Sequence, residues 1–218
     1  MAAGRKSATR AEFGDFQTPE PLARRACELV ARLGVQPRSV VEPTCGTGGF
    51  LVAALGAFPQ VEAAFGLELN NDYAATVRHR LASAGWGQKA QVASGSFFDE
   101  DWTRRLQDLP DPILVVGNPP WVTNAELGAL GSRNLPAKSN FQNRQGLDAI
   151  TGKANFDISE WMLLRSFEWL RGRDACLAML CKTSVARKVL LQAQLRMELR
   201  LDEADHPFLW VTTIKPVP

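Results

Sequence analysis

The apolar residues of this chain gather in short continuous runs, separated by segments with helical spacing. The clearest run covers residues 113–116 and stops at Gly117, Asn118 and two prolines. Such a run is typical of a strand buried on both faces, because that strand has no polar side and proline cannot continue a central strand. Similar runs predict further strands at residues 39–41, 65–69, 91–98, 175–181 and 208–214.

Between these runs the apolar positions recur at the spacing of a helix. The first helix is expected at residues 19–33, since Thr18 is a favourable N-cap, proline suits the first helical position and Gly34 follows the apolar stripe. Asp157 and Glu160 resemble a capping box before a later helix. The full set of predicted helices is 19–33, one from about Gly48, 71–84, 102–106, 158–171 and 185–199.

Strand and helix alternate, which predicts an α/β fold with a doubly wound, mostly parallel sheet. With 218 residues, 45% of them hydrophobic, one domain is favoured over two. Residues 1–12 are small and charged, so we expect a disordered tail before a domain at 13–218. The chain ends soon after its sixth predicted strand, so we expect a seventh strand to be missing or replaced.

Composition narrows the class of protein. The net charge is +2, from 25 basic and 23 acidic residues, which neither proves nor excludes a nucleic-acid partner. The four cysteines include no CxxC pair and lie far in sequence from both histidines, so neither a metal site nor a disulfide framework is predicted. No apolar run approaches the ~18 residues of a membrane span. We therefore expect a soluble cytoplasmic protein with no metal and no membrane partner.

The turn after residues 39–41 reads EPTCGTGG and leads into a helix. It lacks the GKS or GKT of a phosphate-binding loop, and Leu51 stands where a dinucleotide fingerprint needs glycine. Two acids remain as candidates: Glu42 before the glycines, and Glu68 twenty-two residues after Gly46, where a doubly wound fold places a carboxylate that binds ribose hydroxyls. The alternative for either acid is a solvated strand end.

A cluster of acceptors follows the strand at 113–116. The side-chain oxygen of Asn118 and the carbonyls of Asn118 and Pro119 lie beside residues without N–H groups, and Trp121 offers a flat face. This cluster could receive a planar amino group. The alternative is a strand-ending turn, since Asn-Pro is a common turn dipeptide. The candidate catalytic residues are Asn118, Pro119, Pro120 and Trp121.

The next 34 residues, 122–155, show no long periodic pattern. That exceeds what an idle connection needs, so a substrate-facing loop is favoured over a passive one. The segment has four basic and two acidic residues, a balance that suits phosphate contacts and is also common in solvated loops. Its candidate substrate-binding residues are Arg133, Lys138, Arg144 and Lys153.

Taken in order, these motifs resemble the S-adenosylmethionine-dependent DNA adenine N6-methyltransferases with NPPY or NPPW motifs, including the methylase portions of restriction-modification enzymes. The resemblance covers roughly residues 13–200. It implies a Rossmann-like class I methyltransferase fold, S-adenosyl-L-methionine as cofactor, and methyl transfer to the exocyclic amine of an adenine flipped out of duplex DNA. The cofactor-binding residues that it implies are Phe16, Gln17, Thr18, Pro19, Glu42, Pro43, Thr44, Cys45, Gly46, Gly48, Glu68, Leu69, Ser96, Phe97 and Asn118.

The chain departs from that family at two points. Ser96 stands before Phe97 where relatives often have an aspartate for the cofactor's adenine, and Asp99 is the candidate substitute. Relatives also carry a target-recognition region, so one hypothesis is a catalytic fragment that works with a separate region or subunit.

Two other function classes remain open. One is methylation of adenine in RNA or of a glutamine side-chain amide in a protein, since the amide presents the same planar NH2 group. The other is a non-catalytic fragment that binds cofactor or nucleic acid. Cytosine C5 methylation is disfavoured, because no cysteine here follows a proline as the nucleophile of resembling enzymes does.

Overall fold

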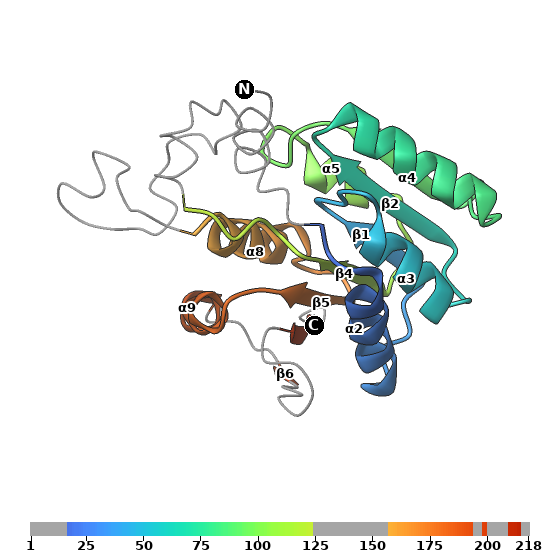
Figure 1. The fold of residues 1–218 in the computed structure, drawn as a ribbon. Helices are drawn as coiled ribbons and strands as arrows, with labels where there is room; N and C mark the ends of the chain where they lie inside the picture. The colour runs from blue at the N-terminus through green and yellow to red at the C-terminus, as the bar shows by residue number, and fades with distance from the viewer. Residues whose placement is uncertain (1–16, 124–156, 194–197, 200–208, 215–218) are drawn as a thin grey trace, which may run out of the picture.

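A seven-stranded sheet with helices on both faces forms the protein (Figure 1). The computed structural model describes residues 17–123, 157–193, 198–199 and 209–214. The strands are β1 (Ser39–Glu42), β2 (Ala63–Glu68), β3 (Ala90–Ser94), β4 (Ile113–Gly117), β5 (Ala175–Leu180), β6 (Glu198–Leu199) and β7 (Leu209–Ile214). The helices are α2 (Glu20–Arg32), α3 (Gly49–Ala57), α4 (Asn71–Ser83), α5 (Trp102–Leu106), α8 (Ile158–Trp169) and α9 (Thr183–Ala193).

The strand order is β3-β2-β1-β4-β5-β7-β6. The first five strands run parallel, β7 pairs antiparallel with β5, and β6 pairs antiparallel with β7. This confirms the predicted α/β fold with a doubly wound, mostly parallel sheet. A seventh strand was expected to be missing or replaced, and the structure has one: the two-residue β6, which pairs antiparallel with β7.

Two predicted boundaries are wrong. The helix predicted at 185–199 lies at Thr183–Ala193, and Glu198–Leu199 instead pair with β7, a long-range contact that two residues cannot signal by periodicity. The strand predicted at 91–98 ends at Ser94. After it the chain turns, and the Ser96 hydroxyl accepts a hydrogen bond from the Phe98 backbone N–H at 3.1 Å.

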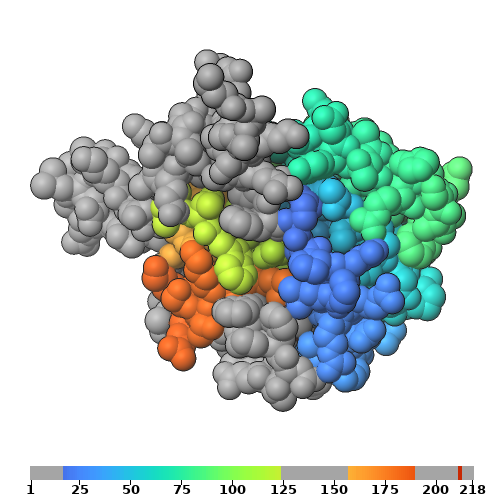
Figure 2. Space-filling view, viewed as in Figure 1, coloured from blue at the N-terminus to red at the C-terminus, as the bar shows by residue number. Residues whose placement is uncertain are grey.

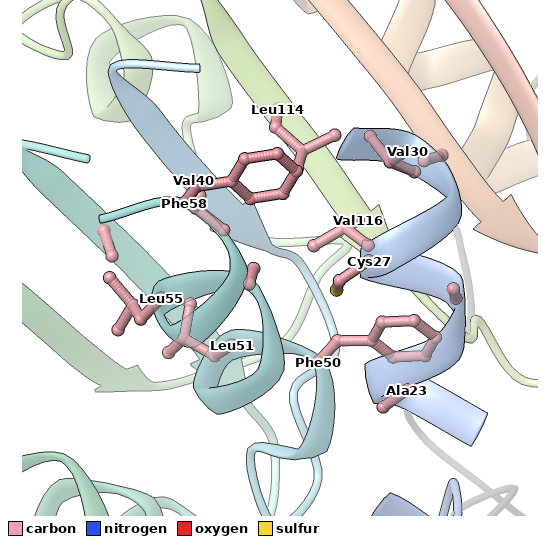
Figure 3. Packing of buried hydrophobic residues seen from close by; sticks show 14 of the residues in the cluster. Ala23, Cys27, Val30, Val40, Phe50, Leu51, Leu55, Phe58, Leu114 and Val116 are labelled. Carbon is pink, nitrogen blue, oxygen red and sulfur yellow. The ribbon is translucent and has the colours of Figure 1, made fainter. Parts of the chain in front are cut away.

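Each face of the sheet has its own hydrophobic core, because adjacent residues of a strand point to opposite sides. Val40, Leu114 and Val116 pack against α2 and α3 on one face, as Figure 3 shows. Val41, Ile113 and Val115 pack on the other face against α5, α8 and α9. Strands with helices on both sides need apolar residues at every position, which is why β4 and β5 are continuous apolar runs.

The carboxyl ends of β1, β2, β4 and β5 lie at one edge of the sheet, since these strands are parallel. The chain order reverses between β1 and β4, so the connections after these two strands leave toward opposite faces. Such a switch point opens a crevice where doubly wound folds bind ligands. No helix within the described ranges is long and apolar enough to cross a membrane.

Candidate active site

The glycine loop after β1 is a tight turn tied to its neighbours. Gly46 and Gly48 have φ values of 50° and 81°, in the left-handed region that favours glycine. A Cβ at Gly46 would lie 2.5 Å from the Gln17 side-chain oxygen, and one at Gly48 would lie 2.7 Å from Val77. The backbone N–H of Cys45 donates to the Leu67 carbonyl of β2 at 2.8 Å. The two glycines therefore permit close packing against Gln17 and α4.

Glu68, at the end of β2, accepts a backbone hydrogen bond at each carboxylate oxygen. Its Oε2 accepts from Gly46 N at 2.7 Å and its Oε1 from Asn70 N at 2.8 Å. Asn70 in turn caps α4, accepting from Asp72 N and Tyr73 N. The carboxylate is thereby fixed beside the glycine loop, and a carboxylate oxygen can accept more than one hydrogen bond.

Glu42, at the end of β1, is buried, with 3% of its surface exposed. Its Oε2 accepts from Leu51 N at 2.7 Å, so the side chain reaches the first turn of α3. Burial raises the pKa of Glu42 well above its usual range, although hydrogen bonds from Leu51 and Phe50 act in the opposite direction. The carboxylate also lies next to β4, because a Cβ on Gly117 would be 3.7 Å from Glu42 Cγ.

The segment before α2 contacts both the glycine loop and the NPPW motif. Gln17 Oε1 accepts hydrogen bonds from the backbone N–H and the hydroxyl of Thr47, both at 2.9 Å. The prediction that Thr18 caps the first helix is wrong, because Pro19 occupies the N-cap position and no side chain caps it. The Thr18 hydroxyl instead accepts from Asn118 Nδ2 at 3.1 Å. A local helix signal therefore yields to a long-range contact.

Asn118 follows β4 at the switch point of the sheet. Its nitrogen is engaged with Thr18, but its Oδ1 is buried and accepts no hydrogen bond from any residue that the structure describes. Leaving a buried acceptor unsatisfied costs about 1–3 kcal/mol. An unpaired buried amide oxygen at a strand end is therefore a candidate ligand-binding atom.

Trp121 is held by the end of β5. Its indole N–H donates to the Leu180 carbonyl at 3.3 Å, and its own carbonyl accepts from Lys182 Nζ at 3.3 Å. The segment after β4 reaches the surface between α2 and the region of β5 and α9 (Figure 2).

A small cavity lies between the glycine loop, the start of NPPW and α8. Its lining combines residues predicted for the cofactor and for catalysis with side chains of α8 and β5: Pro43, Thr44, Phe97, Pro119, Met162, Leu163, Ser166 and Met179. Phe97 also joins an aromatic cluster with Trp102, Trp161 and Trp169. The structure thus brings Phe97 to the glycine loop, while Ser96 lies in the preceding turn.

A scan of protein families matches the model described as N-6 DNA Methylase to residues 5–173. The chain belongs to the N-6 DNA methylase family. The predicted family resemblance is therefore confirmed, and the match includes the glycine loop, Glu68 and the NPPW motif.

Two relatives support this membership. The chain is 48% identical over 182 residues to the type II methyltransferase M.NspV from Nostoc sp., covering 84% of this chain and 38% of that protein. It is 29% identical over 115 residues to the type II methyltransferase M.XamI from Xanthomonas campestris pv. amaranthicola, covering 53% of this chain and 21% of that protein. The chain thus spans well under half the length of either relative.

A solved structure supports the fold alone. The crystal structure of a methyltransferase from Geobacter sulfurreducens aligns with 98% of this chain and 87% of that one, with a TM-score of 0.53 and 13% sequence identity. Together with the strand order, this likeness confirms the predicted Rossmann-like class I methyltransferase fold.

Several predicted site residues lie outside the described residues: Phe16, Arg133, Lys138, Arg144 and Lys153. The division into a tail at 1–12 and one domain at 13–218 stays a prediction, as do the roles of the individual site residues. Within the described ranges, no group of three or more His, Cys, Asp or Glu side chains could hold a metal ion.

Sequence reasoning missed Lys182, which contacts the NPPW motif, and it treated Asp157 only as a helix cap. Lys182 Nζ donates to Asp157 Oδ2 at 2.7 Å. A lysine after an apolar strand resembles a solvated strand end, so the sequence carried no signal for this contact.

Proposed function

We propose that this protein is an adenine-specific DNA methyltransferase, which transfers the methyl group of S-adenosyl-L-methionine to the exocyclic amine of adenine. The observation that carries the proposal is the buried Oδ1 of Asn118 at the carboxyl end of β4, which has no hydrogen-bond donor among the residues that the structure describes. An acceptor in that position fits one N–H of a planar amino group. Membership of the N-6 DNA methylase family and the relatives named as type II methyltransferases agree with this reaction.

The residues around the glycine loop fit S-adenosylmethionine. Glu68 presents two oriented carboxylate oxygens at the end of β2, where ribose hydroxyls are bound in doubly wound folds. The loop contains no lysine to neutralise phosphates, and Glu42 adds a second acid nearby. Phe97, Pro43 and Pro119 line the apolar cavity beside it. When bound, the cofactor supplies a methyl group activated on a sulfonium.

The chain's own residues would prepare the amine. The lone pair of adenine's exocyclic nitrogen is delocalised into the ring, which makes it a poor nucleophile. Hydrogen bonds from its two N–H groups to Asn118 Oδ1 and to the carbonyl of Asn118 or Pro119 would favour a pyramidal nitrogen with its lone pair free. Acceptors that are fixed before the substrate arrives need no reorganisation during the transfer, and the Thr18 contact of Asn118 supports such a fixed position for Oδ1.

DNA is the proposed partner, with the target adenine flipped out of the duplex and stacked beside Trp121. The basic residues of the 122–155 segment are proposed to contact phosphates, on their charge and their position directly after NPPW. Because the relatives are much longer, a separate target-recognition region or subunit is part of the proposal, as is a cytoplasmic location beside the DNA.

A labelled-methyl assay tests the proposal against its alternatives. The protein is incubated with radiolabelled S-adenosylmethionine and, separately, duplex DNA, single-stranded DNA, RNA or a protein extract. Label should enter duplex DNA and be recovered as N6-methyladenine after digestion. A duplex containing only G·C pairs is the matched control and should remain unlabelled.

Other outcomes have clear meanings. Label in RNA or on glutamine of an extract protein would replace the DNA substrate by another planar NH2 group. Cofactor binding without label in any acceptor would favour the non-catalytic fragment.

A further inference from the structure

The end of β5 holds the segment that carries the NPPW motif through one lysine. Lys182 follows β5 after Cys181 and directly precedes α9. Its ammonium donates to the Trp121 carbonyl at 3.3 Å and to Asp157 Oδ2 at 2.7 Å. One side chain thereby links the last residue of NPPW to the residue that caps α8.

Trp121 is bound to the same strand end a second time, through the indole N–H that donates to the Leu180 carbonyl. The indole ring and the backbone of Trp121 therefore both contact the carboxyl end of β5, a strand that lies inside the sheet between β4 and β7. The Lys182 contact thus fixes the backbone of Trp121, while the indole bond fixes its ring.

Asp157 gives the lysine its fixed position. Its side chain is 9% exposed, against 39% for that of Lys182, so the ion pair is partly shielded from water. The second carboxylate oxygen accepts from the backbone N–H and hydroxyl of Ser159 at the start of α8. Shielding and a fixed acceptor make this pair stronger than an exposed surface pair.

The two chain segments that Lys182 contacts, the one after Trp121 and the one at Asp157, also pair with each other. Thr123 forms an antiparallel bridge with Asp157, and the Val122 carbonyl accepts from Ile158 N at 2.9 Å. Lys182 contacts both segments, the first at the Trp121 carbonyl and the second at the Asp157 carboxylate.

We propose that Lys182 is a positioning residue that orients Trp121 for the target base. Its ammonium group binds the Trp121 carbonyl and is itself held in place by Asp157. The proposal rests on the proposed function, in which Trp121 stacks beside the adenine. Lys182 acts through Trp121 and does not touch the reacting atoms. A displaced Trp121 would admit the base in a wrong orientation, and small misplacements lower rates strongly because the reacting atoms must be aligned.

The chain offers a matched control in a second lysine, which joins α9 to α8. Lys188 of α9 pairs with Glu160 of α8 at 3.3 Å, and the Glu160 side chain is 2% exposed. No contact between Lys188 and the NPPW motif is found in the described part of the chain. Lys188→Met therefore removes an α8–α9 ion pair without touching Trp121.

The test compares Lys182→Met, Lys182→Arg and Lys188→Met in single-turnover methyl transfer to duplex DNA, with calorimetry of S-adenosylmethionine and melting curves. Lys182→Met should lower the transfer rate per folded molecule by about tenfold or more, with cofactor affinity unchanged within about twofold. Lys182→Arg, which keeps charge and donors, should retain most of the rate. Lys188→Met should lose melting temperature but keep its rate.

A second readout does not depend on activity. The indole N–H resonance of Trp121, assigned by its loss in Trp121→Phe, should shift in Lys182→Met and stay in place in Lys188→Met. If Lys182→Met does not fold, Lys182→Gln, which keeps a donor without the charge, takes its place in both measurements and should show smaller changes in the same direction.

An unchanged Trp121 resonance in the folded Lys182 variant would overturn the positioning role. So would an equal loss of rate in Lys188→Met, since that would indicate general helix stability. If the unaltered protein transfers no methyl group to DNA, the proposed function fails, while a shifted Trp121 resonance would still support the contact between Lys182 and Trp121.

Discussion

The Asn118 side-chain amide donates to the Thr18 hydroxyl at 3.1 Å, across 100 positions of the sequence. With its nitrogen engaged, the amide turns its oxygen to the opposite side, where Oδ1 is buried without a donor from the described residues. Thr18, in the segment before α2, thus orients the side-chain oxygen of Asn118 in the NPPW motif after β4. Two motifs that are separate in sequence form one structural unit.

Replacing Thr18 by valine should weaken this orientation, because valine has nearly the same shape but no hydroxyl. We expect the single-turnover methyl-transfer rate to fall by about tenfold, on the scale of losing one modest hydrogen bond that positions a catalytic group. Thr18→Ser keeps the hydroxyl and should stay near the wild-type rate. Equal rates in the valine and serine variants would show that the amide is oriented by other contacts.

Glu68 should govern affinity for the cofactor. Glu68→Ala removes the acceptor for Gly46 N and Asn70 N as well as the proposed ribose contact, and should weaken S-adenosylmethionine binding by about 1–3 kcal/mol. Glu68→Gln keeps one acceptor oxygen and should lose less. Calorimetry with S-adenosylmethionine, its demethylated product and ATP measures this, and heat with ATP alone would refute the assignment of the loop.

Glu42 should make stability fall as pH rises. Its pKa in the folded protein is raised by burial, so the unfolded chain loses the proton first, near pH 4.3. Above that pH the folded state binds more protons, and stability falls by up to about 1.4 kcal/mol per pH unit until Glu42 ionises in the folded protein. Glu42→Gln keeps an acceptor for Leu51 N and should remove this slope in urea titrations between pH 4 and 8.

An exposed glutamate provides the opposite control. A hydrogen bond from Arg38 lowers the pKa of Glu62. A lowered folded-state pKa gives stability that is present above the unfolded pKa and lost as pH falls below about 4.3, so Glu62→Gln should remove a slope of the opposite sign there and leave the profile above about pH 5 unchanged. If the free energy of unfolding depends on pH in the same way for the wild type and Glu42→Gln, the ionisation of Glu42 does not cause the slope.

Strands β4 and β5 were predictable because each has an unambiguous local signal in the sequence. A strand buried on both faces needs apolar side chains throughout, and β4 and β5 lie where their apolar runs indicated. The motif order likewise identified the family, since the acids and glycines follow directly from the strand ends. β6 escaped detection because two residues have no period, and its pairing with β7 is a tertiary contact.

The site was less predictable, because its side chains serve partners that are distant in sequence. Thr18 has the local character of a helix cap, but its hydroxyl contacts Asn118. Lys182 lies 61 residues from Trp121 and 25 from Asp157, and neither contact has a local pattern. Glu42 accepts a hydrogen bond from Leu51 N at the start of α3, nine residues on, and its predicted role at the cofactor stays a prediction. Local sequence reasoning places residue types at strand ends, while the fold decides which of them meet.

The role of Asn118 itself is the most direct test of the reaction, because the acceptor and the turn interpretations predict different results. Asn118→Ala removes Oδ1 and leaves one amine hydrogen of the substrate unpaired in a desolvated site. We expect the methyl-transfer rate to fall by at least ~100-fold, the scale for deleting one preorganised polar contact to a transition state. Asn118→Asp adds charge and loses the donor to Thr18. It keeps an acceptor at nearly the same position, however, so it should retain more activity than the alanine variant.

Cofactor affinity and folding separate this effect from a structural one. Affinity for S-adenosylmethionine should barely change in either variant, because the proposed contact is with the other substrate. If Asn118 only ends β4 as a turn residue, both variants should lose melting temperature and keep their rate per folded molecule. Single-turnover methylation measured beside a melting curve distinguishes these results, and a folded alanine variant at near wild-type rate would refute the acceptor mechanism, since the buried Oδ1 would then have no part in the reaction.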